Sequence, residues 1–300
     1  METVWRPGRP VDVRRTLSPL QRGRHDPTHR VDADGSVWRT TLAPTGAATY
    51  RIHQGHPGEI ACQAWGSGAE WVLSGLPDLL GNRDSLEGFE PRLPALERAL
   101  TRNPWLRMPR TKRVMEALVP AILEQKVTGK EATHAFQHLV RRFGTPAPGP
   151  SPEGMVVPPS PRAWRMIPSW EWHQAGVQPF QSRTVVAAAA LAARLEECVD
   201  LPPHEALARL RVVPGVGEWT AAEVAQRAMG DADAISVGDY HLAAFVGWAL
   251  VGRPVDDAEL VTLLEPWRPH RQRVVRLLGL AGATKPRFGP RMTIADYRTL

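Results

Sequence analysis

An aspartate follows a glycine-rich turn in the segment VPGVGEWTAAEVAQRAMGDADAISVGDYH, residues 213–241. Gly215 and Gly217 lie in the turn, Trp219 begins the stretch after it, and Asp239 stands near the end. A single carboxylate can stabilise positive charge that develops on a nearby carbon, and it can orient or deprotonate water. Asp239 also precedes YHLAAFVGWAL, which has helical spacing, and aspartate is a favoured helix N-cap. Capping and chemistry are compatible, because a helix start would also hold the carboxylate in place.

The turn PGVG joins two stretches with helical spacing, EALARL before it and EWTAAEVAQRAMG after it. Its proline fixes one backbone angle, and its glycines permit conformations that other residues avoid. The backbone N–H groups of such a turn, together with the open start of the second helix, can hold an anion such as a DNA phosphate. Contact there positions DNA without reading its sequence, and we expect it at Pro214, Gly215, Val216, Gly217 and Thr220. An ordinary tight connection between two helices is the alternative.

The surrounding chain divides into regions of different pattern. Short alternating stretches, VDVRRTL, SVWRTTLAP and ATYRIHQG, predict strands and are followed by a helix in EWVLSGLPDLLG, so residues 1–104 form an α+β domain with an antiparallel sheet. Residues 105–284 are mainly helical, with a first helical region ending at Gly144 and a bend or helix start near Pro120. A proline-dense loop, TPAPGPSPEGMVVPPSP, follows that region. Residues 285–300 are expected to form a C-terminal tail.

Composition narrows the classes of function. A formal net charge of +6 and a sequence pI of about 9.9 favour a polyanionic partner, most simply nucleic acid, over a basic protein with no such partner. Two cysteines, Cys62 and Cys198, exclude a four-cysteine metal site and a disulfide framework. No apolar run reaches membrane length and no signal peptide is recognised, so a cytoplasmic protein is expected.

Taken together, these motifs resemble the helix-hairpin-helix DNA glycosylase superfamily, and within it the AlkA-type DNA-3-methyladenine glycosylase II group. The resemblance rests on LRVVPGVGEWTA, SVGDYHL, NPWLRMPRTKRVMEALVPAILEQKVT, VVPPSPRAW and LEPWRPHRQRVVRLL. It implies two helical subdomains around a cleft. It also implies a monomer that acts on damaged double-stranded DNA in base excision repair, by hydrolysing the N-glycosidic bond of alkylated purines flipped out of the duplex. No cofactor or catalytic metal is implied, only a structural monovalent cation at the hairpin carbonyls.

The resemblance also assigns roles to residues. Asp239 matches the catalytic aspartate, and Trp219, Glu223 and Tyr240 match the substrate pocket, with a core aromatic as the alternative for Trp219. Bifunctional members carry a lysine where this chain has Trp219, so we expect water as the nucleophile and no lyase activity. The group's pattern has a tyrosine where Glu223 stands and a tryptophan at about Gly279. Glu223 could supply negative charge to a cationic base, or it could be an exposed helix residue.

Other polar residues are candidates for DNA contact. Gln125 and Lys126 match the segment that fills the gap left by a flipped base, and Thr128 and Lys130, with the pair at 141 and 142, are candidates for backbone contact. A solvated helix face is the alternative for all of them. His134 and His138 have metal-ligand spacing but no third ligand nearby, so no catalytic metal is expected. A DNA-binding protein of the same fold with no activity, or with another specificity, remains the alternative to the enzyme.

Overall fold

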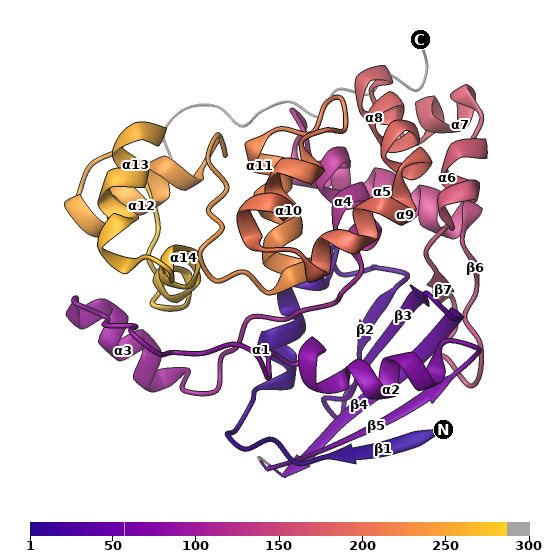
Figure 1. Ribbon diagram of the computed structural model, residues 1–300, viewed down its shortest axis with the longest axis horizontal. Coiled ribbons are helices and arrows are strands. Elements are labelled where there is room, and N and C mark those ends of the chain that lie inside the picture. Colours follow the sequence, from indigo (N-terminus) through magenta and orange to yellow (C-terminus); the bar gives the residue numbers. More distant parts are fainter. Residues whose placement is uncertain (57, 287–300) are drawn as a thin grey trace.

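The computed structural model describes residues 1–56 and 58–286, which form an antiparallel sheet followed by a helical body built around two further cores (Figure 1). This arrangement confirms the predicted fold class, an α+β region followed by a mainly helical one.

The N-terminal sheet has five strands in the order β1-β5-β4-β3-β2, and every neighbouring pair is antiparallel. The strands are β1 (Glu2–Trp5), β2 (His29–Val31), β3 (Val37–Ala43), β4 (Gly46–His56) and β5 (Glu59–Trp65). Alternate residues of β4 and β5, including Ile52 and Ile60, are buried against α1 (Val13–Leu17) and α2 (Ala69–Leu79). The alternation in VDVRRTL predicts a strand, but this stretch forms helix α1. The helix start is fixed by Asp12, whose side chain accepts a hydrogen bond from Arg15 N at 2.9 Å.

The second core surrounds α4 (Val114–Leu123), whose side chains are buried apart from Glu116. Around it pack α5 (Gly129–Phe143), α6 (Pro161–Met166), α7 (Ser169–Gln174), α8 (Pro179–Ala190), α9 (Ala192–Glu196), α10 (Pro203–Leu210) and α11 (Glu218–Val224). Pro120 lies inside α4 rather than at its start. The predicted helical region divides into α4 and α5 because Lys126 has a φ of 56° and Thr128 and Glu131 form a capping box. The proline-dense loop that follows contains a two-stranded pair, β6 (Thr145–Pro146) and β7 (Val156–Val157).

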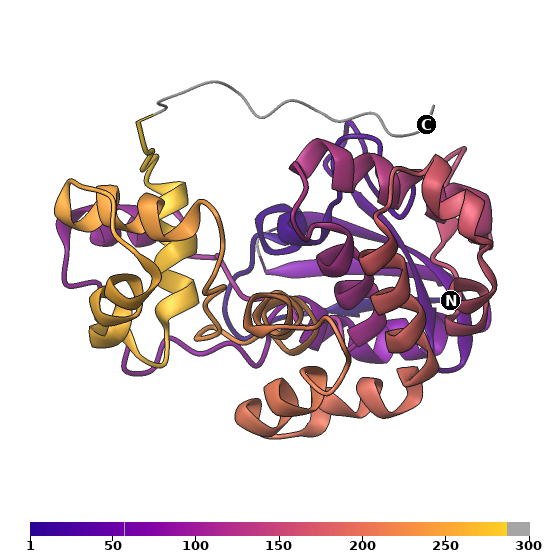
Figure 2. The ribbon, with the colours of Figure 1, turned by 90° about the horizontal axis from the view of Figure 1, so that it is seen from above.

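The third core joins the helix that follows the N-terminal sheet region to the C-terminal helices. Helix α3 (Pro94–Arg102) packs against α14 (Arg271–Leu280), beside α12 (Leu242–Val251) and α13 (Asp257–Leu264), and Figure 2 shows this group set to one side of the molecule. A boundary drawn at residue 104 therefore does not follow the packing, because α3 belongs in space with the C-terminal helices. The connection is reinforced by Arg273, whose Nη1 donates to Asp84 Oδ2 at 3.1 Å. The two side chains are only 2% and 3% exposed.

The predicted hairpin joins α10 and α11 and is anchored in the second core. Val213 and Val216 are buried, whereas Pro214, Gly215 and Gly217 are exposed. Gly215 has a φ of +89°, and a Cβ atom there would lie 2.2 Å from Thr184 Oγ1. Only glycine therefore suits this position, for its backbone angle and for its lack of a side chain.

We predict that Gly215→Ala destabilises the protein by about 1–3 kcal/mol, because alanine must adopt a disfavoured φ and displace Thr184. Gly217→Ala is the matched control, since its φ is −93° and a Cβ atom at this position would meet nothing within 4 Å. Urea unfolding of both variants measures the difference. Equal losses of stability would contradict the role assigned to Gly215.

Candidate active site

Asp239 lies where the segment after α11 turns into α12, and three N–H groups hold its carboxylate. Trp219 Nε1 donates to Oδ2 at 3.1 Å, while His241 N and Leu242 N donate to Oδ1 at 2.8 and 2.9 Å. The side chain is half-buried. It therefore caps the start of α12, and its orientation is fixed by backbone on one oxygen and by an indole on the other.

Trp219 is half-buried and belongs to none of the hydrophobic cores. It stands in the first turn of α11, directly after the hairpin, so its hydrogen bond to Asp239 ties the hairpin unit to the segment before α12. The core-aromatic alternative is therefore wrong. Its role as a wall of the substrate pocket stays a prediction, because it is not among the residues that line the pocket next to Asp239.

A pocket of about 240 Å³ opens beside Asp239, between α11, α12 and α14. One part of its wall is polar and is formed by Glu223, Ser236 and Gln272. The rest is formed by Asp239 and His241 and by three apolar side chains, Leu242, Phe245 and Val275. A concave site with apolar walls and a few convergent polar groups is typical of small-molecule recognition.

Glu223 is partnered within this pocket. Its side chain is 13% exposed, and its Oε2 accepts a hydrogen bond from Arg227 Nη1 at 2.7 Å, one turn further along the chain. Its Oε1 accepts a hydrogen bond from Ser236 Oγ at 2.5 Å. The alternative of an exposed helix residue is therefore wrong, and the carboxylate is paired with one arginine.

A chain of side-chain hydrogen bonds continues from Ser236 through a buried glutamine. Gln226 Nε2 donates to Ser236 Oγ and to Ala234 O, both at 2.9 Å, and Gln226 Oε1 accepts from Gln272 Nε2 at 2.9 Å. Gln226 lies where α11 passes into a π-helical turn, Ala225–Met229. Sequence reasoning missed Ser236, Gln272 and Phe245, because only the packing of α12 and α14 against α11 brings them to the pocket.

Two residues expected near the pocket lie elsewhere. Tyr240 is 88% exposed and does not line the pocket, because the turn that directs Asp239 inward directs its neighbour outward. Gly279 is exposed near the end of α14, and that helix presents Gln272 and Val275 to the pocket instead. A lysine does lie at the pocket's edge: Lys285 Nζ is 2.7 Å from Nδ1 of His241.

The other residues predicted to bind DNA divide into exposed and internal ones. The side chains of Val216 and Thr220 are buried, so they support the hairpin from within. Gln125 Nε2 donates to Thr220 Oγ1 at 2.8 Å and to Gly215 O at 3.0 Å. Gln125 therefore connects the α4–α5 turn to the hairpin, and in this arrangement it is not free to enter a duplex.

Lys126 is exposed, and its ammonium lies 5.8 Å from the centre of the Phe180 ring. Lys130 is exposed on α5, whereas Thr128 is occupied as the cap of that helix. The arginines at 141 and 142 bind within the protein: Arg141 donates to His25 O, and Arg142 pairs with Glu171 at 3.5 Å. Within residues 1–56 and 58–286 no three potential ligands gather at a metal-binding distance. Over the same residues no helix is long and apolar enough to cross a membrane.

Comparison with known proteins places this geometry in context. No family model matches the chain. The chain is similar to a probable bifunctional transcriptional activator/DNA repair enzyme AlkA of Mycobacterium tuberculosis. The two are 30% identical over 180 residues, which make up 59% of this chain and 35% of the AlkA protein. The chain thus spans about a third of the length of the curated relatives it matches.

Solved structures resemble most of the chain. A 3-methyladenine DNA glycosylase from Archaeoglobus fulgidus superposes with a TM-score of 0.78 at 17% identity, over 93% of this chain and 98% of the other. An 8-oxoguanine glycosylase/lyase from Clostridium acetobutylicum superposes with a TM-score of 0.71 at 12% identity, over 93% and 96%. At these identities the likeness concerns the fold. The chain is thus similar in part of its sequence to a probable AlkA protein, and similar in fold to solved DNA glycosylases.

Proposed function

We propose that the protein is a DNA glycosylase that hydrolyses the bond between a damaged base and its deoxyribose. The observation that carries the proposal is the carboxylate of Asp239, held by three N–H groups at the edge of a pocket and tied through Trp219 to an exposed glycine hairpin. A hairpin of this kind can grip a DNA backbone while the pocket receives a base.

The chemistry follows from the position of that carboxylate. Positive charge builds on the sugar as the bond to the base breaks, and a carboxylate beside the sugar stabilises that charge. The electron pair of the breaking bond leaves with the base. Water then adds to the sugar carbon and gives up a proton, which Asp239 can accept. Because the two carboxylate oxygens are hydrogen-bonded in different directions, the group does not need to reorganise as charge develops.

Water is the proposed nucleophile, and strand cleavage is not part of the proposed reaction. The position at which bifunctional members of the resembled superfamily carry a lysine is Trp219, and its Nε1 already donates to Asp239. Lys285 lies at the pocket's edge but is held against His241. An amine bound in this way is less available to attack a sugar carbon.

The exposed hairpin residues Pro214, Gly215 and Gly217 are proposed to contact the DNA backbone. Two exposed lysines, Lys126 and Lys130, would add positive charge close in sequence to Gln125, which binds the hairpin at Gly215 O. A net charge of +6 supports a polyanionic partner. We propose that a single copy suffices, because one hairpin and one pocket lie on the same chain. A monovalent cation at the hairpin carbonyls and a cytoplasmic location stay predictions.

The proposed substrate is an alkylated purine that carries positive charge in DNA. Phe245 offers one aromatic face, and Glu223 supplies a carboxylate in place of further aromatic walls. Arg227 offsets part of that charge. We therefore expect a weaker preference for cationic bases than an unpaired carboxylate would give.

Asp239→Asn is expected to lower the rate of base release from methylated duplex DNA by a factor of about 10²–10³, because the amide cannot stabilise positive charge. Asparagine also caps helices, so the fold should persist. Asp256→Asn is the matched control: Asp256 caps α13 in the same core by accepting from Glu259 N at 2.8 Å.

The assay measures free base, and it measures strand breaks before and after alkali. Breaks only after alkali accord with hydrolysis without lyase activity. Release that survives in Asp239→Asn would assign the chemistry to another residue. No release by the unaltered protein from any methylated base would favour a DNA-binding protein without this activity.

Glu223→Gln is expected to slow release of 3-methyladenine roughly tenfold more than release of hypoxanthine, since only the first base is cationic in DNA. Both substrates are assayed with the same variant, so any loss of folded protein affects them equally. Equal effects on the two bases would rule out a charge-reading role for Glu223.

A further inference from the structure

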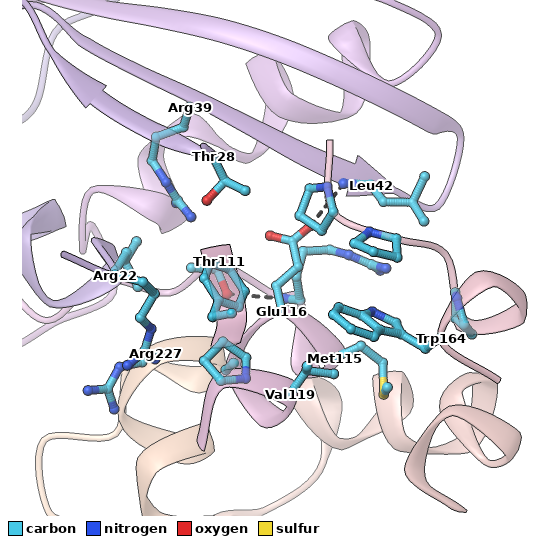
Figure 3. Close-up of a pocket in the computed structure, with 18 residues that line it drawn as sticks. Arg22, Thr28, Arg39, Leu42, Thr111, Met115, Glu116, Val119, Trp164 and Arg227 are labelled. Atoms are coloured by element: carbon cyan, nitrogen blue, oxygen red, sulfur yellow. Dashed lines mark hydrogen bonds between the residues drawn. The ribbon is translucent and has the colours of Figure 1, made fainter. Parts of the chain in front are cut away.

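A second cavity, of about 50 Å³, lies between the N-terminal sheet and α4 (Figure 3). Four arginines line it: Arg22 before β2, Arg39 of β3, Arg113 before α4, and Arg227 after α11. None of the residues that line the pocket beside Asp239 lines this cavity. The inference drawn from it does not depend on the proposed function.

Three of these arginines are neutralised by a carboxylate. The pairs are Arg22 with Glu124 at 2.6 Å, Arg113 with Glu196 at 3.2 Å, and Arg227 with Glu223 at 2.7 Å. The cavity's own acid is Glu116, and one of its oxygens, Oε1, accepts from Thr41 Oγ1 at 2.5 Å and from Leu42 N at 2.9 Å. Burial and the charge of Arg227 lower the pKa of Arg22, as expected where cations are crowded.

Arg39 differs from the other three. It is 6% exposed, and within residues 1–56 and 58–286 no carboxylate lies within 4.0 Å of it. Its Nη1 donates to the Tyr50 hydroxyl at 3.2 Å, and its Nε has no acceptor. Burial, and after it the nearby charge of Arg39, lower the pKa of His29 to about 3. A buried cation without a counter-ion is costly, and an anion in the cavity would remove that cost.

Two further residues that line the cavity carry donors without a protein acceptor. Arg113 Nε is buried without an acceptor. Thr111 Oγ1 accepts from Arg113 N at 3.2 Å, which leaves its own proton free to be donated. Figure 3 shows Arg39 reaching into the cavity from the sheet, with Thr111 on the opposite side. The space is enough for roughly three or four water molecules, or for one small polyatomic ion in their place.

We propose that this cavity binds a small inorganic oxyanion of the phosphate or sulfate class. Arg39, Arg113 and Thr111 all line the cavity, and the protons of Arg39 Nε, Arg113 Nε and the Thr111 hydroxyl have no protein acceptor within the described residues. Donors of this kind are the partners that the oxygens of a tetrahedral anion accept from. The bound anion would join β3 to the segment before α4, and so the sheet to the helical body.

The test compares thermal unfolding of the full chain in about 10 mM sodium phosphate with unfolding in sodium chloride of equal ionic strength and pH. Phosphate is expected to raise the Tm of the unaltered protein by about 2–4 °C. Arg39→Met should abolish that difference, and in chloride it should be at least as stable as the unaltered protein, because a buried charge is removed. The matched control is Arg30→Met on β2, whose side chain is 54% exposed and which should keep the full shift.

An equal rise in Tm on adding phosphate, in the unaltered protein and in Arg39→Met, would overturn the proposal. Such a result would mean that phosphate stabilises the protein by being excluded from its surface and that the cavity holds only water. An absent shift in the unaltered protein would overturn it equally. Should Arg39→Met not fold, Arg39→Lys keeps the charge but loses the forked donors. Calorimetric titration with phosphate should then give a Kd at least tenfold weaker than that of the unaltered protein, and an unchanged Kd would refute the site.

Discussion

The hydrogen bond from Trp219 Nε1 to Asp239 Oδ2 joins α11 to the segment before α12. The bonds from Ser236 to Glu223 and from Gln272 to Gln226 reinforce this connection between α11 and the C-terminal part of the structure. Trp219 is fixed by the hairpin and the second core, whereas Asp239 is fixed by the start of α12 and so by the third core. The bond therefore sets where the carboxylate lies relative to the exposed glycines. A displacement of either core would move the acid away from any strand that the hairpin holds.

Arg227 also connects two parts of the molecule, the pocket beside Asp239 and the segment before the sheet strand β2. Its Nη1 binds Glu223 and its Nε donates to Pro19 O at 3.2 Å, so a single side chain contacts the pocket acid and the segment that leads to the sheet. It belongs to a π-helical turn, a feature found often at functional sites. The widened turn also directs Gln226 toward Ser236. A local irregularity of α11 thus supplies both the counter-ion of Glu223 and the polar wall behind it.

The hairpin and the helix cap at Asp239 could be predicted from neighbouring residues alone. The hairpin was predictable because proline and glycine restrict and permit particular backbone angles, and the capping role of Asp239 was predictable because aspartate precedes an apolar helical pattern. Helix α1 was predicted as a strand, although Asp12 directly before it is a residue type that favours a helix start. The surroundings of Glu223 could not be predicted, since its exposure depends on Ser236, Arg227 and α14. The contact of Gln125 with the hairpin was hidden for the same reason: its partners are 90 and 95 residues away.

The composition of the third core affects the order in which parts of the protein can fold during translation. The apolar side chains of α3, Leu96 and Ala99, are covered by helices that the ribosome synthesises well after α3. The residues that pack together in the sheet and in the second core all precede α12 in the chain. These two parts can therefore fold while the apolar face of α3 is still exposed. Because α12 and α14 are synthesised after α10 and α11, we expect the hairpin of the nascent chain to form before the pocket beside Asp239 does.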